Sequence, residues 1–292
     1  MLIPPWAPNA VVALGLTQVQ PVPGQATAPW VTEGTGFLYG YLTVHDPDPT
    51  KRKYEVYLVT NRHVIEQHGA AAPGPRPDTI GVRLNPIDSS TPARPFDLPI
   101  GDRPGENSWF FHPSGDLDIA AIGLNHQFLK DQGLQNVFFA NDQLTANRSS
   151  LKQLDVSVGD GVFVLGFPAL TLVGAPRNYV IARQGCIARI SDMLDNVSRE
   201  YLIDVLVFPG NSGSPVLLKP EFTSIQGTKG QPNAHLIGIV RAYVPYREVA
   251  ISPQTREPRV LFVQNSGLAE VLPTDYIDEA IKAWRETKLS PQ

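Results

Sequence analysis

Three residues of different types, each beside an apolar run, could together perform nucleophilic catalysis. His63 follows the run Leu58-Val59-Thr60, Asp118 opens another apolar run, and Ser212 lies within Phe208-Pro209-Gly210-Asn211-Ser212-Gly213-Ser214-Pro215. A serine hydroxyl is a poor nucleophile at neutral pH, so a histidine must take its proton during attack and later give it to the leaving group. A carboxylate can then fix the histidine tautomer and stabilise the imidazolium. This chemistry needs no metal and no other cofactor.

The residues around Ser212 suit the second requirement of acyl transfer, which is stabilisation of an oxyanion. Glycines on both sides of the serine allow the backbone to bend, so that the amides of Gly210 and Ser212 can point together at the developing charge. Losing one such donor typically costs about 100- to 1000-fold in rate. We therefore interpret these two amides as the oxyanion hole.

Two other interpretations of the serine segment compete with this one. Gly, Asn and Ser are common turn residues, so the segment alone could be an ordinary turn. The nucleophile elbow of α/β-hydrolases requires Gly-x-Ser-x-Gly and the order serine, acid, histidine. Here the second residue after Ser212 is Ser214, and the histidine and the acid come first. Three signals in the order histidine, aspartate, serine favour a catalytic set over a turn.

With these residues the chain resembles the trypsin-like serine proteases of the chymotrypsin fold, and among them the bacterial HtrA/Deg-like and glutamyl-endopeptidase-like branches. The resemblance extends from about residue 30 to 270 and rests on Gly34-Thr35-Gly36-Phe37-Leu38, Leu58 to Val64, Asp118-Ile119-Ala120-Ala121, Gly210 to Val216 and Leu236-Ile237-Gly238-Ile239. It implies that His63 is the general base, Asp118 the orienting acid and Ser212 the nucleophile.

Asp116 competes with Asp118 for the role of the acid. Residues two apart on a strand face the same side, so either carboxylate could reach the imidazole. The pattern of the family places the acid directly before an apolar-Ala-apolar run, which selects Asp118. We interpret Asp116 as a turn residue.

The remaining sequence predicts an all-β fold. Many short apolar runs are separated by turn residues, and the 292 residues include 28 prolines and 24 glycines. Helical periodicity is convincing only near the carboxyl end, where Ile277, Ile281 and Trp284 share one face and Thr274 is a suitable N-cap. The resemblance implies two antiparallel six-stranded β-barrels of the chymotrypsin/trypsin type, with a C-terminal α-helix that packs on the second barrel.

We expect four segments along the chain. They are an N-terminal β-barrel over residues 8–124, a connecting segment over 125–150, a C-terminal β-barrel over 151–265, and a helix with a tail over 266–292. The first barrel would contribute His63 and Asp118, and the second Ser212. No peptide-binding PDZ domain is expected after the second barrel.

The resemblance also places the substrate pocket, in the segment about six positions before the nucleophile and in the strand after Ile239. The residues concerned are Leu206, Val240, Arg241, Ala242 and Tyr243. An apolar floor at Leu206 favours small or medium apolar residues before the scissile bond, whereas a guanidinium of Arg241 turned into the pocket would favour Asp or Glu. The substrate backbone would add as an antiparallel strand along residues 241–243, which favours extended polypeptide.

Asn211 bears on how the protein would be activated. It stands where digestive relatives carry an aspartate that pairs with a freshly cut amino terminus, so activation by such pairing is not expected here. The chain is therefore either made active or switched in another way, for example by ordering of the segment Val173–Ile181. If the chain is switched, an activating protein partner is a suitable trigger. The alternative function is a catalytically silent or partner-activated binding module of the protease fold.

Composition excludes several other classes of protein. A formal net charge of -4 disfavours a nucleic-acid partner, and no apolar run approaches the roughly 18 to 20 residues of a membrane span. The one cysteine, Cys186, cannot form an intramolecular disulfide. No Lys or Arg precedes Lys51, as a secretory signal would require, although Ala26-Thr27-Ala28 resembles a cleavage site. We expect a cytoplasmic protein, with a periplasmic or secreted location as the alternative.

Overall fold

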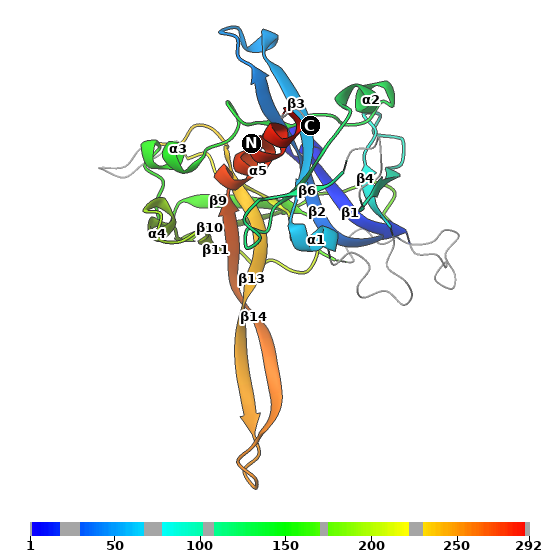
Figure 1. Ribbon diagram of the computed structural model, residues 1–292. Coiled ribbons are helices and arrows are strands. Elements are labelled where there is room, and N and C mark those ends of the chain that lie inside the picture. The colour runs from blue at the N-terminus through cyan, green and yellow to red at the C-terminus, as the bar shows by residue number, and fades with distance from the viewer. Residues whose placement is uncertain are drawn as a thin grey trace.

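The computed structural model describes residues 2–17, 30–66, 78–101, 108–169, 175–221 and 230–289. Two β-structures lie side by side, and a helix at the carboxyl end crosses them (Figure 1). The segment Ala26-Thr27-Ala28 and the first two residues of Val173–Ile181 lie outside the described residues. The predictions made for them are therefore not tested.

The first half of the chain forms an eight-stranded sheet in the order β5-β4-β1-β2-β3-β7-β6, with β8 paired to β2. Its strands are β1 (Val11–Thr17), β2 (Trp30–Val44), β3 (Lys53–Thr60), β4 (Thr79–Leu84), β5 (Arg94–Pro99), β6 (Phe110–Phe111), β7 (Ala120–Gly123) and β8 (Phe139–Ala140).

This sheet differs from the expected closed, six-stranded, antiparallel barrel. In the described part of the chain the two end strands, β5 and β6, each pair with one neighbour and not with each other, so the sheet is a half-barrel. β1 pairs with β2 only as far as Phe37, and β8 then pairs in parallel with Tyr39 and Gly40 of β2. β8, which lies in the expected connecting segment, thus pairs with β2 beyond the point where β1 stops pairing with it.

The second half forms the closed barrel that the sequence predicts, in the order β10-β11-β14-β13-β12-β9. Its strands are β9 (Gly161–Gly166), β10 (Ile181–Arg189), β11 (Tyr201–Asp204), β12 (Pro215–Leu218), β13 (Leu236–Ile251) and β14 (Pro258–Pro273). Closure by hydrogen bonds removes free edges from the barrel itself. However, β13 and β14 continue well beyond it as a two-stranded ribbon (Figure 1).

The half-barrel and the closed barrel share one core, because β9 is buried on both faces. Side chains alternate along a strand, so Val162 and Val164 face the core of the barrel while Phe163 and Leu165 face the half-barrel. The second pair joins the buried cluster that contains Phe37 of β2. The two halves are therefore fixed against each other, and side chains from both can meet at their boundary.

The predicted C-terminal helix is present as α5 (Asp275–Leu289). Ile277 and Ile281 are fully buried, and Trp284 stacks on Phe110 of β6 with 4.8 Å between the ring centroids. The helix thus covers the half-barrel as well as the end of β14, which corrects the expectation that it packs on the second barrel. The hydroxyl of Thr274 donates to the carbonyl oxygen of Ala146 at 3.1 Å and so ties the start of the helix to the preceding segment.

The other helical segments are short. They are η1 (Ala7–Ala10), η2 (Pro49–Lys51), α1 (Arg62–Glu66), α2 (His126–Asp131), α3 (Arg148–Gln153) and α4 (Ser191–Leu194). None of the helices in the described residues is long and apolar enough to cross a membrane. The domain boundaries stay a prediction.

Candidate active site

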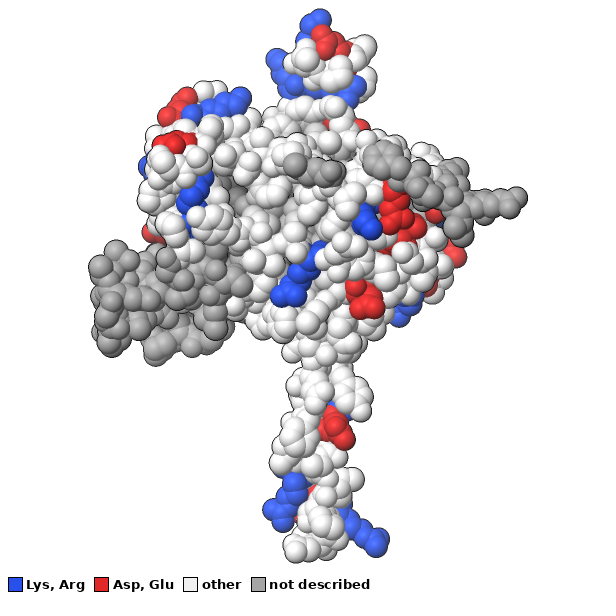
Figure 2. Space-filling model, turned by 180° about the vertical axis from the view of Figure 1, so that it is seen from behind, with Lys and Arg blue, Asp and Glu red and all other residues white. Residues whose placement is uncertain are grey.

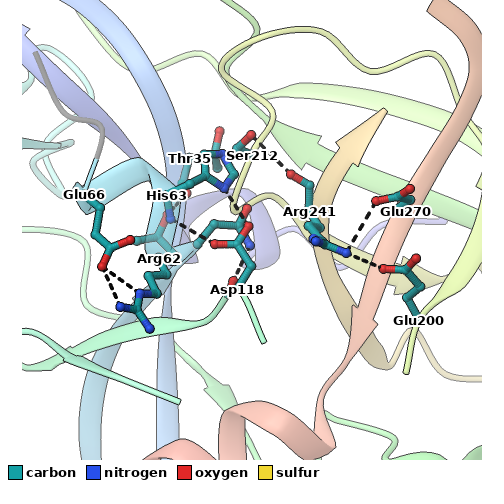
Figure 3. Close-up of polar contacts among 11 residues, drawn as sticks. Thr35, Arg62, His63, Glu66, Asp118, Glu200, Ser212, Arg241 and Glu270 are labelled. Carbon is teal, nitrogen blue, oxygen red and sulfur yellow. Dashed lines mark hydrogen bonds and ion pairs between the residues drawn. The ribbon is translucent and has the colours of Figure 1, made fainter. Parts of the chain in front are cut away.

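His63 lies in the short helix α1, directly after β3, and Asp118 holds it at two points. The backbone amide of His63 donates to Oδ1 of Asp118 at 2.9 Å, and ring atom Nδ1 lies 2.6 Å from Oδ2 (Figure 3). The side-chain amide of the buried Asn61 donates to the carbonyl oxygen of Asp118 at 2.8 Å and joins the same two segments. When Nδ1 carries the proton and donates to the carboxylate, Nε2 is left as a proton acceptor.

Asp116, the competing acid, has other partners. It is exposed, forms an ion pair with Arg199 and accepts a hydrogen bond from the hydroxyl of Ser114. The Ser114 bond and the Arg199 guanidinium together lower the pKa of Asp116 to about 2. Asp118 has only 15% of its side chain exposed, against 63% for Asp116. The structure therefore brings Asp118, and not Asp116, to His63.

Ser212 lies in a tight loop between β11 and β12. The side chain of Asn211 accepts a hydrogen bond from the amide of Phe208 at 3.0 Å, and the amide of Asn211 donates to the carbonyl oxygen of Phe208 at 2.9 Å. Gly210 and Gly213 have φ values of +93° and +84°, which side chains rarely allow. Asn211 thus closes the loop locally instead of pairing with a distant amino terminus.

A buried threonine of β2 joins the half-barrel to this loop. The hydroxyl of Thr35 donates to the carbonyl oxygen of Gly210 at 2.7 Å and accepts from the amide of Phe167 at 3.0 Å. The amide of Thr35 donates to the carbonyl oxygen of Ser212 at 2.8 Å. Sequence reasoning missed this role, although Thr35 lies in the run Gly34-Thr35-Gly36-Phe37-Leu38 that supports the resemblance, a signal that could have indicated it.

The amide of Gly210, one of the two assigned to the oxyanion hole, is oriented by a contact on the other side of the loop. The carbonyl oxygen of Pro209 accepts from the amide of Ala169 at 2.7 Å. In a trans peptide the next N–H points the opposite way, so the amide of Gly210 is directed away from Ala169. None of the hydrogen bonds between described residues uses the amide of Gly210 or that of Ser212. This arrangement can present both N–H groups to an oxyanion.

His63, Asp118 and Ser212 line one cleft of about 670 Å³ at the boundary between the half-barrel and the barrel. Within the described chain Ser212 Oγ forms no hydrogen bond with His63; its contact is with the carbonyl oxygen of Arg241, at 3.5 Å (Figure 3). A hydrogen bond of this length is weak. Catalytic hydrogen bonds are often long or poorly aligned before substrate binds, so this geometry is compatible with a role of Ser212 beside His63.

Four of the five residues expected in the substrate pocket line this cleft, namely Val240, Arg241, Ala242 and Tyr243. The fifth, Leu206, does not: its side chain is 43% exposed, whereas Val205 and Val207 on either side are buried. Because side chains alternate in extended backbone, Leu206 points away from the face that its neighbours occupy. Val207, from the same expected segment, lines the cleft in its place together with Phe208, which sequence reasoning did not assign.

Arg241 is held by two carboxylates. Its Nη1 lies 2.7 Å from Oε2 of Glu200 and 3.7 Å from Oε2 of Glu270 (Figure 3). Burial disfavours the charged guanidinium, but the bond to Glu200 and the charge of Glu270 outweigh it and raise the pKa of Arg241. Burial also raises the pKa of Glu270. The guanidinium therefore already has carboxylate partners and is poorly placed to bind an acidic substrate.

Comparison with known proteins gives little beyond the fold. The chain matches no family model and no curated protein. Among solved structures it is similar to human heparin binding protein, with a TM-score of 0.48 and 9% identity over 97% of this chain and 94% of that one. It is also similar to two inactivated protease paralogues of the scabies mite, S-I1 and S-D1. Both have a TM-score of 0.45, with 13% and 12% identity over 97% of this chain and 95% of theirs. Similarities this weak carry no argument about activity.

Proposed function

We propose that the chain is a trypsin-like serine endopeptidase that hydrolyses peptide bonds of extended polypeptides. The observation that carries the proposal is the 2.6 Å contact between Nδ1 of His63 and Oδ2 of Asp118 in the cleft that Ser212 also lines. In this contact the carboxylate orients the imidazole, so that its other nitrogen can act on the serine hydroxyl.

The proposed reaction proceeds through an acyl-enzyme. Nε2 of His63 takes the proton from Oγ of Ser212 while Oγ attacks the carbonyl carbon of the peptide bond, and the amides of Gly210 and Ser212 bind the oxyanion. The imidazolium then gives its proton to the leaving amine, and the C–N bond breaks. A water molecule repeats the sequence on the ester, and the acid product and the free serine are formed. Asp118 stabilises the imidazolium in both halves.

The free edge of β13 supports an extended substrate. β12 pairs with β13 only as far as Ile239, and the nucleophile loop adds two further hydrogen bonds, from the amide of Gly213 to the carbonyl oxygen of Val240 and from the amide of Val240 to the carbonyl oxygen of Ser214. Beyond Val240 none of the described strands pairs with this edge. A substrate strand can take this position, antiparallel to β13 at residues 241–243, with its scissile bond beside Ser212.

Small or medium apolar side chains before the scissile bond fit the cleft best. Its lining includes Val207, Phe208, Val240 and Ala242, and Arg241 is already bound by carboxylates. Cleavage of a peptide library checks this preference. A library cut mainly after Asp or Glu, with that preference lost in Arg241→Ala, would overturn the assignment.

Labelling with a fluorophosphonate probe, followed by mass spectrometry of the modified peptide, tests the activity itself. We expect a label on Ser212 in the wild type and none in Ser212→Ala or in His63→Ala. The labelling is measured from about pH 6 to 9, a range that spans the titration of an ordinary histidine. Absence of label at every pH would contradict the proposal and favour a catalytically silent or partner-activated binding module.

A further inference from the structure

The ribbon formed by residues 244–266 has no cover in the part of the chain that the structure describes. β14 pairs with β11 only from Leu268 onwards, and β12 leaves β13 at Ile239. Beyond these points two strands pair only with each other, and they project from the barrel (Figure 1). An isolated two-stranded hairpin is marginally stable in water. A ribbon of this length therefore gains from a further strand at one of its edges.

The side chains of the ribbon are largely apolar and exposed. Seven large apolar residues are between 47% and 61% exposed, and they are Tyr246, Val249, Ile251, Val260, Leu261, Phe262 and Val263. On the face that Figure 2 shows, the ribbon carries few charges between the barrel and the tip, and basic side chains lie near the tip. Long, exposed, apolar strand edges are sites where another chain pairs.

Both faces of the ribbon carry apolar pairs, which is unusual for a sheet in contact with water, and each face also carries one exposed charge of β13, Arg247 or Glu248. Val249 lies opposite Leu261 on one face, and Ala250 lies opposite Val260 on the other. An antiparallel sheet with one wet face shows apolar residues on one side only. A strand that pairs with β13 would therefore meet apolar neighbours on both of its faces, with Arg247 and Glu248 as the two charged positions between Tyr246 and Val249.

The edge of the ribbon is continuous with the cleft. Arg241, Ala242 and Tyr243 line the cleft beside Ser212, and the same strand, β13, runs on without a break to Ile251. A strand antiparallel to β13 must run from the tip towards Ser212, so its residues before the scissile bond lie along the ribbon. The eight steps from Tyr243 to Ile251 span roughly 26 Å at about 3.3 Å per residue.

We propose that the ribbon binds the part of a polypeptide substrate that precedes the scissile bond, and that it selects a largely apolar run there. Such runs form the buried strands of folded proteins and become accessible only when a protein is unfolded. The substrate class is therefore unfolded polypeptide cut shortly after an apolar stretch. This inference rests on the proposed endopeptidase function and specifies its substrate.

Binding to the Ser212→Ala protein tests the ribbon separately from catalysis. The probes are two fluorescein-labelled peptides measured by fluorescence anisotropy. The long peptide carries eight residues of Val, Ile and Leu before an alanine at the cleavage position, with lysines at its amino end for solubility, and the short peptide keeps the three residues nearest the alanine. We expect the long peptide to bind roughly tenfold more tightly than the short one, since several large apolar contacts are added.

Two double variants in the Ser212→Ala background locate the binding. Tyr246→Ser/Val249→Ser removes large apolar side chains from β13, the strand beside which the peptide would pair. The control, Phe262→Ser/Val263→Ser, removes two apolar side chains at the same height from β14, one strand farther away. All four positions are exposed, so neither change removes a core contact. We expect the first variant to weaken binding of the long peptide roughly tenfold and the control to change it less than about twofold.

Three results would overturn the inference. They are equal binding of the long and short peptides, equal loss in both double variants, and a wild-type dimer in sedimentation velocity that either double variant converts to a monomer. The last result would make the ribbon an interface between copies of the chain. Failure of the catalytic proposal is a different result, because absence of fluorophosphonate labelling with retained, ribbon-dependent peptide binding would refute catalysis and leave the ribbon as a polypeptide-binding surface.

Discussion

Replacing Thr35 with valine should destabilise the fold and disturb the nucleophile loop together. The change keeps the volume of a fully buried side chain and removes its hydroxyl. That hydroxyl donates to the carbonyl oxygen of Gly210 and accepts from the amide of Phe167. Each buried backbone group left without a partner costs about 1–3 kcal/mol. Together the two losses should lower the free energy of unfolding by about 2–6 kcal/mol.

Thr32→Val is a matched control on the same strand. Thr32 is also buried, and its hydroxyl oxygen accepts one hydrogen bond, from the indole nitrogen of Trp30 at 3.1 Å, far from the nucleophile loop. This variant should lose about 1–3 kcal/mol of unfolding free energy. Thr35→Ser keeps the hydroxyl and should retain most of the stability. Urea denaturation followed by tryptophan fluorescence measures all three variants.

The effect on catalysis separates the role of Thr35 from a general loss of stability. Misplacement of a reacting group by about 1 Å can cost 100-fold in rate, so fluorophosphonate labelling of Ser212 should slow by up to about 100-fold in Thr35→Val. It should be unchanged in Thr32→Val and restored in Thr35→Ser. The reasoning is refuted if Thr35→Val loses no more stability than Thr32→Val and labels at the wild-type rate.

Three further predictions follow from the contacts. Asp118→Asn should slow fluorophosphonate labelling about 10⁴-fold, because it removes the charge that fixes the imidazole tautomer, while Asp116→Asn should change it little; equal effects would refute the assignment of the acid. Gly213→Ala should prevent folding, as judged by circular dichroism, because the added Cβ would lie 1.9 Å from the carbonyl oxygen of Thr35 in β2. Gly133→Ala is the control: its φ is also positive, +63°, but its Cβ would meet open space, so this variant should lose only about 1 kcal/mol of unfolding free energy. Similar stabilities of the two variants would contradict this reasoning. Burial raises the pKa of Asp278 to about 6, so the folded state holds its proton more tightly than the unfolded chain, and unfolding free energy should fall by about 1–3 kcal/mol between about pH 4 and 6. Urea denaturation across this range should show a smaller fall in Asp278→Asn, and identical profiles would refute the role of that carboxyl.

The sequence predicted those parts of the site that depend on residue type and local pattern. The contact of Asp118 with His63 agrees with the acid selected from the resemblance, and the tight loop around Ser212 agrees with its flanking glycines. These features are set by a few neighbouring residues, so a short stretch of sequence is enough to indicate them. The assignment of catalytic roles stays a prediction until the nucleophile is labelled.

The parts that were missed depend on residues far apart in the chain. Leu206 was placed in the pocket by counting back from the nucleophile, but its side chain points away from the cleft. The specificity interpretation of Arg241 required knowledge of Glu200 and Glu270, which lie on other segments. Whether a side chain faces a cleft or another charge is decided by strand register and packing, which leave no local signal.

The sequence by itself determined the all-β character, the C-terminal helix and the set of residues able to perform acyl transfer, and the resemblance to the protease family implied the closed second barrel. Apolar periodicity, turn residues and side-chain chemistry are properties of short segments, so they can be recognised in the sequence without a structure. Only the tertiary structure decided that the first sheet is a half-barrel, that Thr35 of β2 is bonded to the loop of Ser212, and that β13 continues into an apolar ribbon. Each of these depends on which strands pair and where the pairing stops. Hydrogen bonding between distant strands sets that outcome, and many pairings are compatible with the same alternating pattern.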